Sequence, residues 1–248
     1  MRPFPMVALA ALLVIGPARA EEKPAPAAEA EAPATRPPLP DADAFYRRAR
    51  ERHAPMFERY AGTETTMWQR VARRHSETLE LRSHSKIKVI VRDFYFAPRQ
   101  IEVLEYWEDG EKKDPSDYTD RGGKEPRHPL LHSSAPENYR VSMIGRRKKA
   151  GHDCIALKIE GREKTPRHLE GTLWIDEETL DLVAVDVHPA KTPFGVKSIE
   201  VDMRFRQEGD AMLSMGGETR VHVHVPLVFP NNLLIITDEV LAARGIPK

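Results

Sequence analysis

The sequence predicts a mainly β domain of the α+β class, in which an antiparallel sheet carries one N-terminal helix. Residues 171–205 hold three runs in which apolar and polar residues alternate. Similar runs lie on both sides of this stretch, and a helical pattern precedes them all. Since successive strand side chains point to opposite faces, each run has one apolar face and one wetter face. This pattern is typical of an antiparallel meander with a one-sided core.

The expected strands follow one another at the spacing of a large meander or barrel, and we expect about nine or ten of them. They lie at residues 62–73, 78–92, 95–107, 139–143, 155–159, 173–175, 183–187, 199–205, 221–225 and 233–237. The first is ambiguous, because its threonines favour a strand whereas residues 68–74 can continue a helix. Residues 108–111 predict a hairpin turn, and residues 145–151 (GRRKKAG) a charged turn. Residues 112–138, rich in proline, are expected to be a loop that is either functional or mobile.

A short helix, or two, is expected between residues 41 and 60. Asp41 and Asp43 are the candidate N-caps. Phe45, Ala49 and the stem of Arg52 share one face, and Pro55 is expected to interrupt or kink the helix.

The N-terminus carries the pattern of an export signal. Arg2 is followed by an apolar run over residues 6–15 and by Ala18-Arg19-Ala20, so we expect a signal peptide at residues 1–20, cleaved after Ala20. Residues 21–40, rich in Pro and Ala, predict a flexible linker. The remainder, residues 41–248, is expected to form a single β domain that is periplasmic or secreted and peripheral to the membrane, without a transmembrane helix in the mature chain.

Charge and composition exclude several classes of function. The chain has 38 basic and 38 acidic residues, and this balance argues against a nucleic-acid partner. It contains no Gly-x-Ser-x-Gly, His-Glu-x-x-His, phosphate-loop or dinucleotide motif, so no residue is assigned a catalytic role. Cys154 is the only cysteine, so the chain cannot form an internal disulfide, and we interpret this thiol as inert.

A pair of histidines offers a weak alternative as a metal site. His222 and His224 stand two residues apart on one strand and therefore share a sheet face. Two imidazoles can bind one metal ion, but His128 and His132 add ligands only if their loop folds over that face. We favour the interpretation that His222 and His224 are simply the polar phase of the strand.

The apolar phase of the strands supplies candidates for a ligand-binding cavity. These are Ile87, Val89, Val91, Leu173, Ile175, Val183, Val185, Val187, Ile199, Val201, Met203, Phe205, Val221, Val223 and Val225. Alternation alone does not distinguish side chains that line a hollow barrel from side chains that fill a core.

One segment resembles a known family. Residues 170–179 (EGTLWIDEET), followed by Leu182-Val183-Ala184-Val185, resemble the outer-membrane lipoprotein-sorting proteins of the LolA/LolB-like superfamily. Residues 139–145 (YRVSMIG) and 154–157 (CIAL) fit the strands that precede this hairpin in the family. The resemblance implies a curved, incomplete β-barrel with a helix packed on it and an apolar cavity that holds acyl chains, without enzymatic activity or cofactor. The basic residue that these carriers use near the cavity has no identifiable counterpart here.

The expected function is therefore the extracytoplasmic binding or transport of a lipid or a lipid-modified protein in an apolar cavity. Its partners would be lipid or lipoprotein acyl chains. The alternative is a sensor or adaptor domain of the same fold that binds an envelope protein without transporting lipid, as a related LolA-like domain does in envelope-stress signalling.

Overall fold

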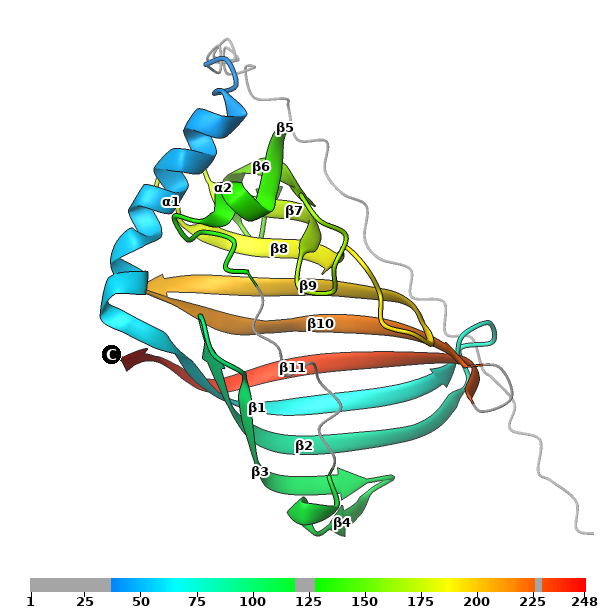
Figure 1. Ribbon diagram of the computed structural model, residues 1–248. Helices are drawn as coiled ribbons and strands as arrows, with labels where there is room; N and C mark the ends of the chain where they lie inside the picture. Colours follow the sequence, from blue (N-terminus) through cyan, green and yellow to red (C-terminus); the bar gives the residue numbers. More distant parts are fainter. Residues whose placement is uncertain (1–36, 119–127, 226–228) are drawn as a thin grey trace, which may run out of the picture. The chain divides into compact units, whose positions relative to one another are not determined.

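An antiparallel sheet of eleven strands, in the order β4-β3-β2-β1-β11-β10-β9-β8-β7-β6-β5, carries the fold (Figure 1). The computed structural model describes residues 37–118, 128–225 and 229–248, without the side chains of residues 224, 225 and 229–231. The strands are β1 (Tyr60–His75), β2 (Leu81–Phe94), β3 (Gln100–Glu108), β4 (Glu111–Lys113), β5 (Tyr139–Lys149), β6 (His152–Gly161), β7 (Leu169–Asp176), β8 (Leu182–Pro189), β9 (Val196–Glu208), β10 (Ala211–Val225) and β11 (Phe229–Pro247). The helices are α1 (Ala42–Arg59), α2 (Ala135–Asn138) and the 3₁₀ turn η1 (Pro115–Asp117).

The sheet stays open, because β4 and β5 lie at the two ends of the strand order and do not pair with each other. The predicted fold is thereby confirmed: a mainly β, incomplete antiparallel barrel with a helix at its N-terminal end. The ambiguous residues 62–73 belong to a strand, β1. The expected signal peptide and most of the expected linker lie outside the described residues.

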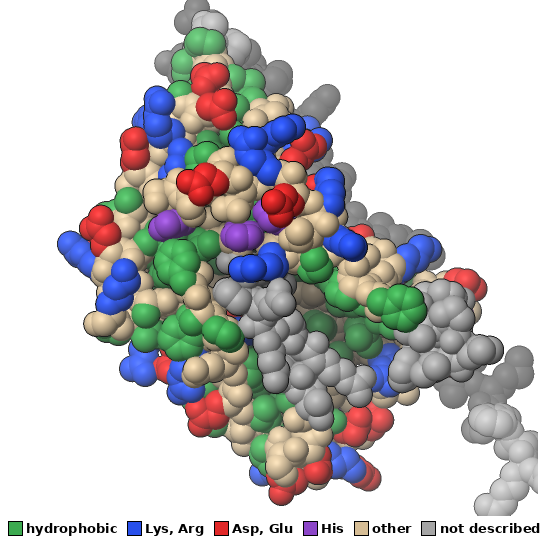
Figure 2. Space-filling view, in the orientation of Figure 1, with side chains coloured by type: hydrophobic (Ala, Val, Ile, Leu, Met, Phe, Trp, Pro, Cys, Tyr) green, Lys and Arg blue, Asp and Glu red, His purple; other side chains and the backbone are tan. Residues whose placement is uncertain are grey.

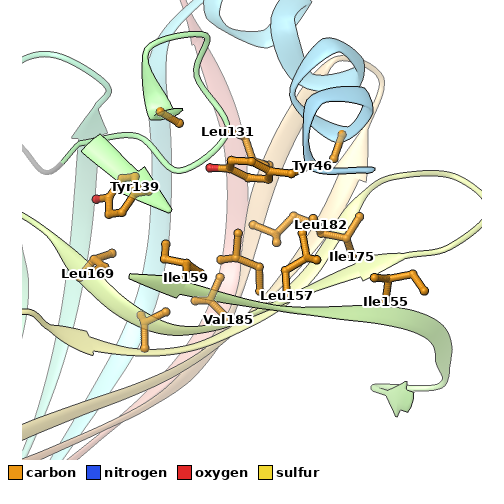
Figure 3. Close-up of a cluster of buried hydrophobic side chains, with 14 of the residues drawn as sticks. Tyr46, Leu131, Tyr139, Ile155, Leu157, Ile159, Leu169, Ile175, Leu182 and Val185 are labelled. Carbon is orange, nitrogen blue, oxygen red and sulfur yellow. The ribbon is translucent and has the colours of Figure 1, made fainter. Parts of the chain in front are cut away.

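Helix α1 packs one apolar stripe against the sheet. Asp41 caps its start, since its Oδ1 accepts a hydrogen bond from the Ala44 amide at 2.8 Å. The buried side chains of the helix recur at helical spacing: Phe45, Tyr46, Ala49, His53, Met56 and Phe57. In Figure 3, Tyr46 lies beside Leu131, on the same side of the sheet as Ile155, Leu157 and Ile159 of β6.

Two expectations for this helix concern Pro55 and Arg52. An interruption at Pro55 is wrong, because α1 continues to Arg59. The carbonyl of Glu51, which loses its helical donor to Pro55, belongs to an exposed residue and can be solvated. Arg52 is half-buried, and its guanidinium forms an ion pair with Asp181 at 3.2 Å.

Two-residue turns join several strands. Asp109 and Gly110 have φ of +48° and +88°, as a tight β3–β4 hairpin requires, and this confirms the predicted turn. Ala150 and Gly151, with φ of +50° and +89°, make the β5–β6 turn. The charged turn expected over residues 145–151 is therefore wrong in extent, because β5 continues to Lys149 with a register shift between Met143 and Gly145.

Strands β7 and β8 approach each other closely at Gly171. Its φ is +139°, and a Cβ there would stand 2.1 Å from the Asp186 carbonyl oxygen, so only glycine fits. Four residues further on, the pairing shifts, with Trp174 opposite Ala184 and Ile175 opposite Leu182. Val183 has no partner in this register and lies outside the cluster that contains Val185 and Val187, unlike the simple alternation expected for β8.

Strand β11 lies in the middle of the sheet, between β1 and β10. Its apolar run at residues 233–237 was predicted, but the strand continues to Pro247 and pairs with β1 down to Tyr60. Of the loop expected at residues 112–138, the structure describes the end of β4, η1 and α2, and residues 119–127 lie outside the described residues.

Candidate functional site

Two buried apolar clusters lie on the same face of the sheet. In an antiparallel sheet, paired residues point to the same side. The pairing runs unbroken from Leu157 through Leu173, Val185 and Met203 on β6–β9 to Ile87 on β2. We call this side the inner face. One cluster covers β5–β9 beneath α1, and the other lies on β1–β3 around Met67, Ile87, Val89 and Val91.

Between the two clusters, apolar side chains remain half-exposed. We call them the central strip: Val71 of β1, Ile199, Met203 and Phe205 of β9, Val221 and Val223 of β10, and Leu234 and Ile236 of β11. Figure 2 shows hydrophobic side chains below and to the right of the histidines on one face, with most charged side chains nearer the margin of that face. The central strip is thus apolar surface that the other described residues leave only partly covered.

The predicted cavity residues divide between core and central strip. Those buried in the cluster beneath α1 are Leu173, Ile175, Val185, Val187 and Val201, and those buried in the β1–β3 cluster are Ile87, Val89 and Val91. Those half-exposed in the central strip are Ile199, Met203, Phe205, Val221 and Val223. Val183 is buried at the β8 irregularity, and the side chain of Val225 lies outside the described residues. Val71, Leu234 and Ile236 were not predicted.

Aromatic rings connect α1 with the β2–β3 loop. Phe57 of α1 meets Tyr95 at a centroid distance of 4.9 Å and His132 at 5.0 Å. Phe96, although exposed, also contacts the His132 ring at 5.0 Å. Since Tyr95 and Phe96 follow β2 and His132 precedes α2, segments from the two halves of the sheet meet on the inner face.

A polar pair lies on the inner face among the apolar residues. Gln69 of β1 donates from Nε2 to Oδ1 of Asp238 of β11 at 3.0 Å. Burial raises the pKa of Asp238 above its usual value, and the hydrogen bond from Gln69 opposes this shift. The pairing of Met203 with Gly217 and of Gly217 with Asp238 places this carboxyl beside the central strip. No motif in the sequence marks the pair, because its members are 169 residues apart.

His53 is the most deeply buried histidine near the site. Burial lowers the pKa of His53 to about 4, so that its ring is neutral at pH 7. Its Nε2 accepts a hydrogen bond from the Leu182 amide at 3.4 Å, whereas Nδ1 has no partner among the described residues. This histidine anchors α1 to the start of β8.

The histidines considered as metal ligands are engaged elsewhere or undescribed. The His128 ring packs on His168 at 4.7 Å, and His132 Nδ1 lies 2.8 Å from Ser134 Oγ. His222 is half-exposed on β10, and the side chain of His224 lies outside the described residues. Within the described ranges, no three His, Cys, Asp or Glu side chains come together as a metal site.

Cys154 lies on the outer face of the sheet and is buried. Burial raises its pKa to about 11, so the thiol stays protonated at neutral pH. The neighbouring His152 is paired with Asp176, Nδ1 to Oδ2 at 2.9 Å. These contacts provide no activated thiolate.

The outer face, by contrast, is held by hydrogen bonds and ion pairs. Trp174 donates from Nε1 to Asp186 Oδ2 at 2.6 Å, and Lys149 Nζ contacts Asp186 Oδ1 at 2.8 Å. Burial favours a higher pKa for Asp186, but the bonds from Lys149 and Trp174 outweigh it and hold the pKa below its usual value. The tryptophan of the Trp-Ile-Asp segment therefore stabilises the β7–β8 wall from outside and does not face the central strip.

Comparisons with known proteins give matches among solved structures alone. No family model matches the chain. No curated protein matches it either. It is similar to an outer membrane lipoprotein-sorting protein domain from Vibrio parahaemolyticus (11% identity, 81% of this chain, 90% of that chain, TM-score 0.40). It is also similar to a LolA superfamily protein from Nitrosomonas europaea (8% identity, 85% of this chain, 95% of that chain, TM-score 0.38).

A third similar structure is the MucA/MucB complex of Pseudomonas aeruginosa, with 9% identity, 81% of this chain and 99% of that chain covered, and a TM-score of 0.27.

In the described part of the chain, no helix has both the length and the apolar character needed to cross a membrane. Since every TM-score quoted is below 0.5, we take no function from these proteins. The resemblance predicted from residues 170–179 is confirmed to this extent: the solved structures similar to this chain include a LolA superfamily protein and a lipoprotein-sorting protein domain.

Proposed function

We propose that this chain is a non-enzymatic, periplasmic binder or carrier of a lipid or a lipid-modified protein, and that the acyl chain lies along the central strip. The observation that supports it is the position of this strip. Half-exposed valines, isoleucines, leucine, methionine and phenylalanine occupy the inner face between two packed clusters, where a filled core would bury them.

The energetics fit an acyl ligand. Each methylene removed from water stabilises a complex by about 0.8 kcal/mol, so a dozen methylenes offer about 10 kcal/mol before costs. Association costs on the order of 4–15 kcal/mol, which leaves a weak to moderate affinity without specific polar contacts. Such an affinity suits a carrier that must release its cargo.

The test is lipid binding by the purified, signal-cleaved protein. Native mass spectrometry should show co-purified lipid, and a fluorescent fatty acid should bind with saturation. Val221→Asp, in the central strip, should weaken that binding. Thr237→Asp places the same charge on the exposed outer face of the adjacent strand, opposite Arg70, and should leave binding unchanged. A clean apo mass together with no fatty-acid binding would refute the proposal.

The adaptor alternative also has one observation in its favour. Leu173, Ile175 and Val185 are packed against other side chains of this chain, so a large part of the predicted cavity wall is filled. Capture of one defined envelope protein by a lipid-free sample, undiminished by Val221→Asp, would favour an adaptor over a carrier.

A further inference from the structure

A cleft of about 490 Å³ between α1, α2 and β5 is lined by four arginines. Arg47 and Arg50 belong to α1, Arg140 to β5, and Arg162 directly follows β6. Among the described residues, Asp43 is the one acidic residue in its wall. We call this the arginine cleft, and its formal charge from these side chains is +3, four positive against one negative.

Two of the arginines are held in place by backbone carbonyls. Arg50 donates from Nη1 to the Ser133 carbonyl at 3.2 Å, and Arg162 donates from Nε to the Pro136 carbonyl at 2.7 Å. A guanidinium has five N–H donors in a rigid plane, so each retains further donors. The Nε of Arg50 is buried and has no hydrogen-bond partner among the described residues.

The other two arginines are exposed. Arg47 stands on α1, and Arg140 lies opposite Glu160 in the β5–β6 pairing. Glu160 is itself paired with Lys158 at 2.5 Å, so its charge is already shared. The aromatic residues Tyr46 and Tyr139 complete the wall. Their hydroxyls donate to the carbonyls of Leu130 and His128, so both phenols are turned to structural contacts.

We propose that the arginine cleft binds a phosphomonoester group, presented either by a phospholipid head group or by a small free phosphate compound. Planar guanidinium forks match the oxygens of phosphate and bind them in pairs. A charge of +3 also favours a dianion over a single carboxylate. The residues involved lie outside the central strip, so this inference does not depend on acyl binding there.

The experiment titrates the folded, signal-cleaved protein by calorimetry in 0.1 M NaCl with two probes. One is glycerol 3-phosphate, and the other is dihexanoyl phosphatidic acid, which presents the same group on a short-chain lipid. At least one probe should bind with a dissociation constant below about 1 mM. The double variant Arg47→Ala/Arg140→Ala should lose at least tenfold in affinity, because it removes two charge-assisted contacts. Arg48→Ala is the matched control, since it removes the same charge from an exposed position of the same helix that does not line the cleft.

Each outcome decides the proposal. Arginine-dependent binding of glycerol 3-phosphate supports it and identifies a small phosphate compound as a sufficient ligand. Arginine-dependent binding of the lipid alone supports it and identifies a head group. If neither probe binds at 10 mM, or if the double variant and Arg48→Ala behave alike, the proposal is overturned. Arg47→Glu, at an exposed helix position, provides the same comparison should the double variant not fold.

Discussion

Placing one carboxylate at two positions of the inner face tests whether core and central strip are correctly distinguished. Val185 is 4% exposed and pairs with Leu173 and Met203 in the cluster beneath α1. Val221 is half-exposed and pairs with Ile199 and Leu234. Both valines belong to the same apolar phase of the sequence, so a difference between Val185→Asp and Val221→Asp comes from packing alone.

The expected magnitudes differ widely. Val185→Asp loses about 1.5–3 kcal/mol of side-chain burial. It also places an unpaired carboxylate in a packed core, which costs several kcal/mol more. The sum is comparable with the whole stability of a domain, about 5–15 kcal/mol. At Val221 the carboxylate can reach water, so we expect a loss of about 1–2 kcal/mol and a folded protein. Contact with about two methylenes of a bound chain is lost there, about 1.6 kcal/mol, so acyl binding should weaken at least tenfold.

Urea unfolding followed by circular dichroism measures the first effect, and titration with a fluorescent fatty acid measures the second. Val185→Asp should be unfolded or close to unfolding in buffer. Val221→Asp should remain folded with a urea midpoint lowered by about 1 M or less, and should bind the fatty acid at least tenfold more weakly. A stable Val185→Asp would show that this part of the face is not a packed core, and undiminished fatty-acid binding by Val221→Asp would remove the central strip as the acyl site.

Three further changes test the electrostatics and the sheet. The pKa of His53 is about 4 in the folded protein, below the value of ~6.5 in the unfolded chain. As the pH falls, the unfolded chain therefore takes up a proton first. The free energy of unfolding should decrease by about 3 kcal/mol between pH ~6.5 and pH ~4. His53→Gln should flatten this part of the pH profile of the urea midpoint, and an unaltered profile would exclude His53 as its cause. Trp174→Phe should cost about 1–2 kcal/mol through the lost bond to Asp186, yet leave fatty-acid affinity unchanged; a weakened affinity would contradict its place on the outer face. Gly171→Ala should prevent recovery of folded protein, whereas Gly110→Ala, with φ of +88° and open space around it, should cost only about 1 kcal/mol, and equal effects in a melting experiment would refute the close β7–β8 approach.

Alternation predicted the strands well wherever pairing is regular. Leu173, Ile175, Val187 and Val201 all point to the inner face, as their spacing indicates. Val183 departs from the alternation expected for β8, because the β7–β8 pairing shifts between Trp174 and Ile175. Such a shift depends on how the two strands pair and is not encoded in either strand alone. The second half of β11 shows the same limit, since it lacks clear alternation and is fixed by its pairing with β1.

The site was less predictable than the sheet. Val185 and Val221 both belong to the apolar phase of an alternating strand. Val185 is buried because it belongs to the cluster that includes Leu131 and the apolar side chains of α1, whereas Val221 lies outside that cluster. Pairs such as Gln69 with Asp238 arise where strands distant in sequence become neighbours. The arginine cleft likewise draws on α1, β5 and the residue that follows β6, and local patterns do not report such convergence.

Because β11 lies between β1 and β10, the sheet can be completed only after the last strand of the chain has paired. Strands β1 to β4 and strands β5 to β10 each pair with their sequence neighbours, so both groups can form early as local hairpins. They are joined only when β11 inserts between β1 and β10, bringing Tyr60 opposite Pro247. Closing so long a stretch of chain is slow, and until it happens each group exposes an unpaired strand edge that invites association with other chains. For the exported protein proposed above, aggregation or binding by a chaperone would compete with folding during the time before β11 pairs.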